Sequence, residues 1–299
     1  MSPDTSLPTE ISPEALGFKR ELRLTTPVVF LPPALDIVPQ LLVFLGDEEK
    51  NGELLAELIR VDPGLTANVL RVANSAAFSG AYRMENLSAA ILRLGLREVY
   101  RIVLQVVASP VFLNATQPGA STLDLWRHSL QSAVAAQVLA RRLGEDSELA
   151  FTAGLLHDVG KLIFHQLFGK DYVLMVHDAS AQNALLYQRE FARYQTDHAA
   201  VGGRLLKRWN FPESMIHTVQ FHHELAKCPK PDLRLVSLVF ASNLLAHKLA
   251  EPSPFPLHFL AGSPAVLKNL GLGSIDELWE YEPEVTEAFD REYARLTAG

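Results

Sequence analysis

The feature that most constrains the fold is the spacing of apolar residues, which from Leu31 onward recur at the three- and four-residue intervals of amphipathic helices. The two-residue alternation of half-buried strands is scarce. Helix signals separate the apolar stripes. Asp62-Pro63 places a capping residue before a proline at the first helical position, and we expect Ser88 to cap the stretch AAILRL, which Gly95 ends. The sequence therefore predicts an all-α protein.

Two breaks divide this helical pattern, QPGAS at 117–121 and EPSPFPLHF at 251–259. A long helix over about 123–143 should follow the first break, which would separate two helical lobes that meet near 110–120. The predicted segments are an N-terminal extension over 1–30, an N-terminal helical lobe over 31–116, a second helical lobe over 117–250 and a helical tail over 251–299.

Composition and charge exclude several classes of function. The chain has 299 residues and a formal net charge of −7, and its basic residues form no extended run, so nucleic acid is not expected as a partner. The single cysteine, Cys228, excludes an internal disulfide. No apolar run approaches the ~20 residues that span a bilayer, and the N-terminus lacks a secretory signal. These features predict a cytoplasmic protein without a membrane partner.

Histidines are concentrated in the second predicted lobe, where nine of the ten lie between His128 and His247. Several of them adjoin carboxylates or one another, which is unusual for surface residues. Asp124 and His128 are four apart on one expected helix and would share a face. The combinations are Asp124 with His128, His157 with Asp158, Asp197 with His198, and His222 with His223.

Mixed imidazole and carboxylate donors suit a divalent transition metal (iron, manganese, nickel or zinc) better than calcium. One or two such ions could bind a phosphate and activate a bridging water. Lys161, one helical turn beyond His157-Asp158, could neutralise phosphate charge. Spacing alone leaves open whether these distant segments converge. The five histidines outside these combinations are expected to be ordinary core or capping residues: His165, His177, His217, His247 and His258.

The stretch GLLHDVGKL at 154–162 resembles the signature of the HD superfamily of metal-dependent phosphohydrolases, whose pattern is a helical His, then His-Asp, then later His residues and a final Asp. The N-terminal half resembles the HDOD branch, with a DPxLTxxxLxxxNS-type motif from Asp62 to Ser75. We expect Asn74 of this motif to satisfy backbone groups. The resemblance covers about residues 30–250. It implies an all-helical fold whose second lobe is an HD-type bundle, and a role in bacterial signalling without an established general catalytic activity.

The sequence departs from the related HD-GYP phosphodiesterases, which hydrolyse cyclic dinucleotides. HHELAKCPKPD at 222–232 lacks the Gly-Tyr-Pro segment that follows the double histidine in those enzymes. Asn243, in VFASNLLAH, stands where the last family Asp would be, and it brings a carbonyl oxygen but no charge. Asp124 falls where some HD-GYP enzymes place an extra carboxylate. The ligands that the resemblance implies are Asp124, His128, His157, Asp158, His198, His222, His223 and Asn243.

Three functional hypotheses follow. The leading one is a bacterial regulatory HDOD protein with a partly retained His/Asp metal site, acting as a module that binds a signalling protein or a nucleotide ligand and hydrolyses little or nothing. The alternative is a metal-dependent phosphohydrolase acting on a nucleotide or cyclic dinucleotide, with Lys161 as the catalytic residue on the phosphate and Asn243 as the feature against it. In the third, the metal only holds helices together.

Overall fold

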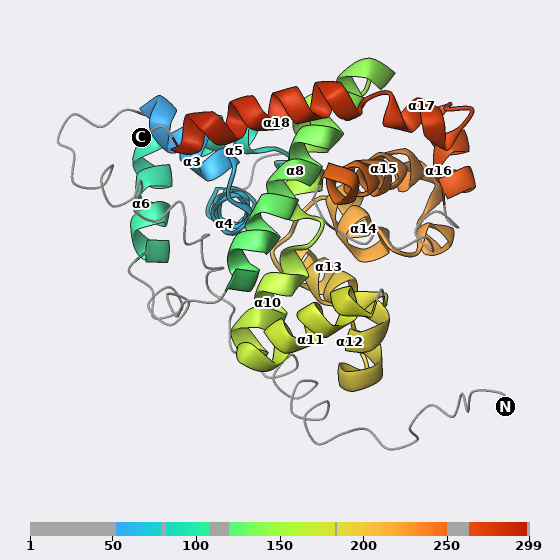
Figure 1. The fold of residues 1–299 in the computed structure, drawn as a ribbon. Helices are drawn as coiled ribbons and strands as arrows, with labels where there is room; N and C mark the ends of the chain where they lie inside the picture. Colours follow the sequence, from blue (N-terminus) through green and yellow to red (C-terminus); the bar gives the residue numbers. More distant parts are fainter. Residues whose placement is uncertain (1–51, 79–81, 108–119, 183, 250–262, 298–299) are drawn as a thin grey trace, which may run out of the picture.

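The computed structural model describes residues 52–78, 82–107, 120–182, 184–249 and 263–297, and every regular element within these ranges is helical (Figure 1). The predicted all-α class is therefore confirmed. The elements are α3 (Gly52–Arg60), α4 (Pro63–Ala73), α5 (Leu87–Leu94), α6 (Leu96–Val107), α8 (Ala120–Leu143), α9 (Ser147–Leu156), α10 (Val159–Phe168), α11 (Lys170–Ala181), α12 (Leu186–Tyr194), α13 (His198–Arg208), α14 (Glu213–Phe221), the 3-10 turns η2 (Leu225–Lys227) and η3 (Lys230–Asp232), α15 (Leu233–Leu249), α16 (Ser263–Leu270), α17 (Ile275–Trp279) and α18 (Glu282–Thr297).

The predicted start of α4 is confirmed. Asp62 is its N-cap, and Oδ1 of Asp62 accepts a hydrogen bond from the backbone nitrogen of Leu65 at 2.6 Å. At the other end of the motif, the side-chain amide of Asn74 donates to the carbonyl oxygen of Met84 at 3.0 Å, and its Oδ1 accepts from the backbone nitrogen of Met84 at 2.7 Å. Asn74 thus connects the end of α4 to the segment before α5 by hydrogen bonds to backbone groups, as expected from the sequence.

The predicted cap of α5 is wrong by two residues. Asn86, whose backbone is extended, is the N-cap and accepts from the backbone nitrogen of Ala89 at 2.9 Å, whereas Ser88 lies inside the helix. Asparagine and serine are equally good N-caps, so the residue with the extended backbone, Asn86, determines where the helix begins. Gly95 ends the helix as predicted, with a φ of 74° that favours glycine.

The long helix α8 runs through the middle of the molecule and packs against α9, α15 and α18 (Figure 1). Helix α18, the last of the chain, lies across the top of α8 and towards α3 and α5. Trp126 of α8 donates its indole hydrogen to the carbonyl oxygen of Val61 at 2.9 Å, which fixes α8 against the turn between α3 and α4. The helices before and after residue 120 are therefore in direct contact.

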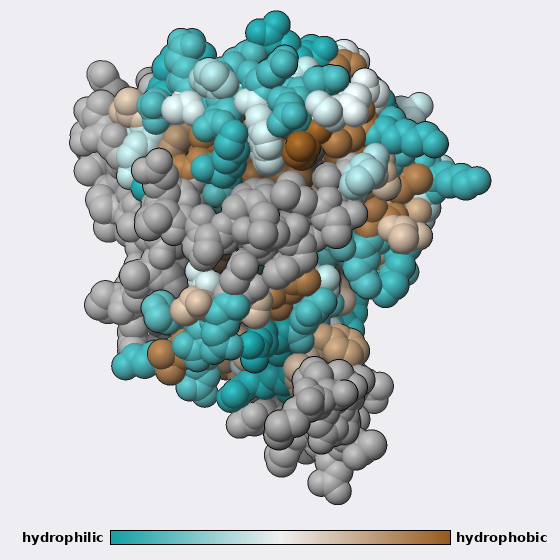
Figure 2. Space-filling model, turned by 45° about the vertical axis from the view of Figure 1, so that its right-hand side comes forward, coloured by the Kyte–Doolittle hydropathy of each residue, from teal (hydrophilic) through white to brown (hydrophobic). Residues whose placement is uncertain are grey.

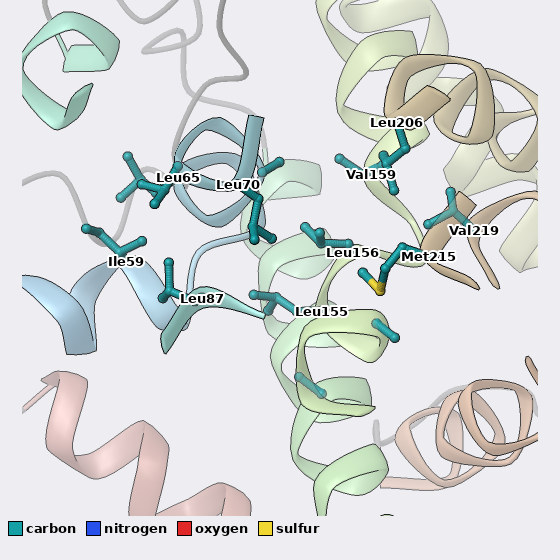
Figure 3. Close-up of a cluster of buried hydrophobic side chains, with 14 of the residues drawn as sticks. Ile59, Leu65, Leu70, Leu87, Leu155, Leu156, Val159, Leu206, Met215 and Val219 are labelled. Carbon is teal, nitrogen blue, oxygen red and sulfur yellow. The ribbon is translucent and has the colours of Figure 1, made fainter. Parts of the chain in front are cut away.

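One apolar cluster continues from the N-terminal helices into the C-terminal ones (Figure 3). Leu70 of α4 and Leu87 of α5 lie on one side of it, Leu155 and Leu156 of α9 in the middle, and Val219 of α14 beyond them. All five are buried. The predicted lobe boundaries at residues 30, 116 and 250 lie outside the described residues, so the division into lobes stays a prediction.

No helix among the described ranges combines the length and apolarity needed to cross a membrane. Hydrophilic residues predominate on the described surface shown in Figure 2, with smaller hydrophobic groups between them.

Candidate metal centre

Asp158 lies at the centre of the histidine constellation. Helix α9 ends at Leu156, His157 and Asp158 form the junction, and α10 begins at Val159, so the His-Asp pair occupies a tight connection between two buried helices. Both side chains are buried. A charged carboxylate at such a depth requires partners of opposite charge or hydrogen-bond donors.

The two oxygens of Asp158 face two different sets of imidazoles. Oδ2 lies 3.6 Å from Nε2 of His128 and 3.3 Å from Nε2 of His157. Oδ1 lies 3.2 Å from Nε2 of His198 and 3.6 Å from Nε2 of His222. His223 joins the second set, because its Nε2 is 2.9 Å from Nε2 of His198. Two groups of potential ligand atoms, each within 4.8 Å of one another, therefore share one carboxylate.

The Nδ1 atoms of two of these histidines are hydrogen-bonded to backbone carbonyl oxygens, and these bonds fix the tautomers of the two rings. Nδ1 of His157 lies 2.7 Å from the carbonyl oxygen of Gly154, and Nδ1 of His222 lies 2.8 Å from that of Val219. A carbonyl oxygen only accepts, so Nδ1 carries the hydrogen and Nε2 keeps its lone pair in the neutral ring. Metal-binding histidines are commonly oriented in this way.

The inner atoms of this centre have no hydrogen-bond partner. They are buried nitrogens and oxygens: Nε2 of His128, His157 and His222, and Oδ1 of Asp158. Oδ1 of Asn243, on α15, is also buried and has no hydrogen-bond partner. Buried polar atoms are paired in most proteins, so a convergent group of unpaired lone pairs indicates a site that can hold a cation. The donor set fits a divalent transition metal, because it combines neutral imidazoles with one carboxylate.

Helix α13 is placed against α10 by glycine. A Cβ atom at Gly160 would lie 1.9 Å from the backbone oxygen of His198 and 2.9 Å from the backbone nitrogen of Gly202. Only glycine permits this approach, which brings His198, the first residue of α13, to Asp158. Asp197 caps α13 by accepting from the backbone nitrogen of Ala200 at 2.8 Å. On the α13 side, a Cβ atom at Gly202 would lie 3.2 Å from the backbone nitrogen of Gly160.

Glu190 of α12 is a site residue that the sequence did not indicate. Its Oε2 lies 2.7 Å from Nδ1 of His198 and accepts from the backbone nitrogen of the same residue at 2.8 Å. Its Oε1 accepts from the hydroxyl of Tyr172, on α11, at 2.5 Å. All three side chains are buried. A single glutamate in a helix as polar as LYQREFARY is normally interpreted as solvated, so only packing identifies it.

Three predicted site residues need separate description. Lys161 pairs with Oδ2 of Asp158 at 2.6 Å, and its side chain is 19% exposed, so it can reach the solvent side of the centre. Asn243 is buried on α15. Asp124 belongs to α8, one turn before His128, but its side chain lies outside the described residues.

The five histidines expected to be ordinary differ in their surroundings. His177 is exposed and His165 is half-buried, while His217 pairs with Asp232 at 2.6 Å. His258 lies outside the described residues. His247 departs from the expectation, because its ring centre is 4.7 Å from that of His128. Its position four residues after Asn243, on the same helical face, was the available signal.

Burial and neighbouring charges shift the pKa values in opposite directions. Burial lowers the pKa of His222 to about 4 and holds those of His128 and His223 well below their usual value. Burial also acts against the charged form of His198, but the charge of Glu190, the hydrogen bond to Glu190 and the nearby carboxylate of Asp158 outweigh it and raise this pKa to about 9. Burial opposes the charge of Asp158 too, yet His157 and Lys161 keep its pKa well below the ordinary value.

The HDOD family model matches residues 31–225, about two thirds of the chain. The chain belongs to the HDOD family. An uncharacterised protein of Treponema pallidum (strain Nichols) is 28% identical over 203 residues, which are 67% of this chain and 39% of that protein. A ribonuclease Y of Lawsonia intracellularis (strain PHE/MN1-00) is 31% identical over 125 residues, which are 42% of this chain and 18% of the enzyme. This HDOD protein thus spans less than half the length of these relatives.

Solved structures share the fold. The MmoQ response regulator from Methylococcus capsulatus str. Bath has a TM-score of 0.65 and 28% identity, with 83% of this chain and 97% of that chain covered. An HDOD domain protein of unknown function from Geobacter sulfurreducens has a TM-score of 0.51 and 27% identity, with 93% and 98% covered. The resemblance stated from the sequence is confirmed.

Proposed function

We propose that this HDOD protein is a regulatory module that holds one or two divalent transition metal ions around Asp158 and uses them to bind a phosphate-containing ligand, with little or no hydrolysis. The observation that carries the proposal is the carboxylate of Asp158, whose two oxygens each face a separate histidine set. The likeness to a response regulator agrees with a signalling role. A nucleotide or the phosphorylated part of a signalling partner would provide the ligand.

Charge favours an anionic ligand. Among the described side chains, Asp158 is the one carboxylate that both ligand groups contain, and the other members are imidazoles. One or two dications therefore keep excess positive charge in this centre, and Lys161 adds another. A bound metal would act as a Lewis acid towards a phosphate oxygen. Lys161, half-buried beside Asp158, is placed to pair with a second phosphate oxygen.

The same residues argue against rapid hydrolysis. A general base works best when its pKa lies near the operating pH. His157 and Lys161 keep the pKa of Asp158 well below its ordinary value despite burial, so this carboxylate is a weak base. Asn243, on α15, occupies the position of the last family Asp and cannot accept a proton at neutral pH.

Elemental analysis of protein purified without added metal is the first test. We expect iron, manganese, nickel or zinc at about one or two ions per chain. Binding of inorganic phosphate and of a panel of nucleotides and cyclic dinucleotides is then measured by calorimetry before and after chelation. Binding should disappear on chelation and in His157→Ala, and it should persist in His177→Ala, which alters an exposed histidine. Absence of metal would contradict the proposal.

A metal-dependent phosphohydrolase is the alternative, and the partial similarity to ribonuclease Y is the observation that favours it. Its substrate would be a nucleotide or cyclic dinucleotide, with Lys161 on the phosphate. Rapid metal-dependent turnover by the purified protein would establish this alternative and overturn the regulatory proposal. If Asn243→Asp raised turnover and His157→Ala abolished it, the metal centre would be the site of hydrolysis.

A further inference from the structure

His247 lies at the metal centre, although neither ligand group contains it. It is on α15, one turn after Asn243, so both side chains project from the same face of the helix. Its ring centre is 4.7 Å from that of His128 on α8, with an angle of 40° between the ring planes. The contact between α8 and α15 therefore places a further imidazole beside the first of the two histidine sets.

The spacing of this pair matches that of the potential ligands themselves. The ring centres of His128 and His157 are 5.5 Å apart, and those of His222 and His223 are 4.0 Å apart. The value for His247 and His128 falls between the two. The ring of His247 is thus as close to that of His128 as the rings within each set are to one another.

His247 is half-buried, and its ring packs against that of His128, whose Nε2 lies 3.6 Å from Oδ2 of Asp158. A neutral imidazole is the form that binds a metal. His247 is therefore placed to add a nitrogen donor on the His128 side of the centre.

Two polar atoms on α8 and α15 are unpaired. Nε2 of His128 and Oδ1 of Asn243 are buried and have no hydrogen-bond partner. Asn243 is 5% exposed, so its carbonyl oxygen is withdrawn from solvent. An amide oxygen alone binds a transition metal weakly, whereas an imidazole on the same helical face is a strong donor.

We propose that His247 is a ligand of the metal position formed by His128, His157 and Oδ2 of Asp158, and that it replaces the donor strength missing at Asn243. The inference rests on the proposed metal centre and specifies one of its two positions. Three imidazoles and one carboxylate make this position nitrogen-rich. It is therefore suited to zinc, iron or nickel and unsuited to magnesium or calcium.

The test compares zinc binding by the full chain, His247→Ala and His177→Ala. Metal-free protein is titrated with Zn²⁺ in competition with a chromophoric chelator, and X-ray absorption of the loaded proteins counts imidazoles per zinc. We expect His247→Ala to weaken one Zn²⁺ by about 10–100-fold or more and to lower the imidazole count. The Zn²⁺ at His198, His222 and His223 should be unchanged, and His177→Ala should match the unmodified chain.

The outcomes separate this inference from the proposed function. If the unmodified chain binds no metal, the proposed metal centre fails. If it binds Zn²⁺ and His247→Ala binds with the same affinity and the same imidazole count as His177→Ala, the centre stands and the role of His247 is overturned. Circular dichroism of the metal-free variants checks folding. Should His247→Ala not fold, His247→Gln, which keeps a polar group of similar size, carries the same comparison.

Discussion

Oε2 of Glu190 lies 2.7 Å from Nδ1 of His198 and 2.8 Å from the backbone nitrogen of the same residue. One carboxylate thus orients both the ring and the start of α13. Its other oxygen accepts from Tyr172, so α11, α12 and α13 meet at a single buried charge. Helices α11 and α12 are thereby linked to His198, the first residue of α13.

The first prediction concerns Glu190→Gln. The amide keeps the shape but loses the charge that holds the ring of His198, so we expect metal affinity to fall about 10–100-fold, as for other partners behind a metal ligand. Competition with a chelator measures it. The control is Glu224→Gln, which alters a glutamate paired with Lys227 on the surface. Equal affinities of the two variants would show that Glu190 has no positioning role.

The second prediction concerns Asp158→Asn. Because one carboxylate serves both histidine sets, its loss should weaken metal binding at both positions together, whereas His222→Ala should affect only one. Elemental analysis after gel filtration gives the stoichiometry. Asp178→Asn, at an exposed carboxylate on α11, is the matched control. Retention of one full equivalent of metal in Asp158→Asn would refute the bridging role.

The third prediction is the pH dependence of the stability of the metal-free protein. Burial lowers the pKa of His222 and of His247 to about 4, so between pH 6.5 and 4 the unfolded chain binds protons that the folded chain does not. Stability should therefore fall with falling pH, by about 1.4 kcal/mol per pH unit for each group.

On the alkaline side the sign is reversed. The pKa of His198 is raised to about 9 by Glu190 and Asp158 in spite of burial, so between pH 6.5 and 9 the folded chain holds a proton that the unfolded chain has lost. Stability should fall as pH rises through this range, again by about 1.4 kcal/mol per unit. Urea unfolding from pH 4 to 9 should show a maximum near pH 6.5. A steady increase over the whole range would be inconsistent with these shifts.

The fourth prediction concerns Gly160→Ala. The added Cβ would lie 1.9 Å from the backbone oxygen of His198, and backbone cannot move aside as a flexible side chain can. We expect a loss of about 3 kcal/mol in the free energy of unfolding, the upper part of the usual range for overpacking, together with weaker metal binding. Gly273→Ala is the control, because its Cβ would meet only the end of the Glu277 side chain. Urea unfolding of both variants provides the comparison.

Local features of the fold could be predicted from the sequence because each depends on neighbouring residues. Apolar spacing indicates helices, and Asp62 before Pro63 marks the start of one. The family pattern named His157, Asp158 and His198, which the structure brings together. The exact start of α5 was ambiguous in the sequence, because Asn86 and Ser88 are both good N-caps. The backbone conformation shows that Asn86 is the cap.

Tertiary structure alone decided how the centre is built. The two oxygens of Asp158 face different histidine sets because of where α8, α13 and α14 lie in space. Contacts between distant helices of this kind leave no periodic pattern in the sequence. Glu190 looks like a surface residue until α11 and α13 bury it, and His247 looks like a core residue until α15 packs against α8. Periodicity reports which face of a helix is buried, but only packing determines which buried polar groups meet.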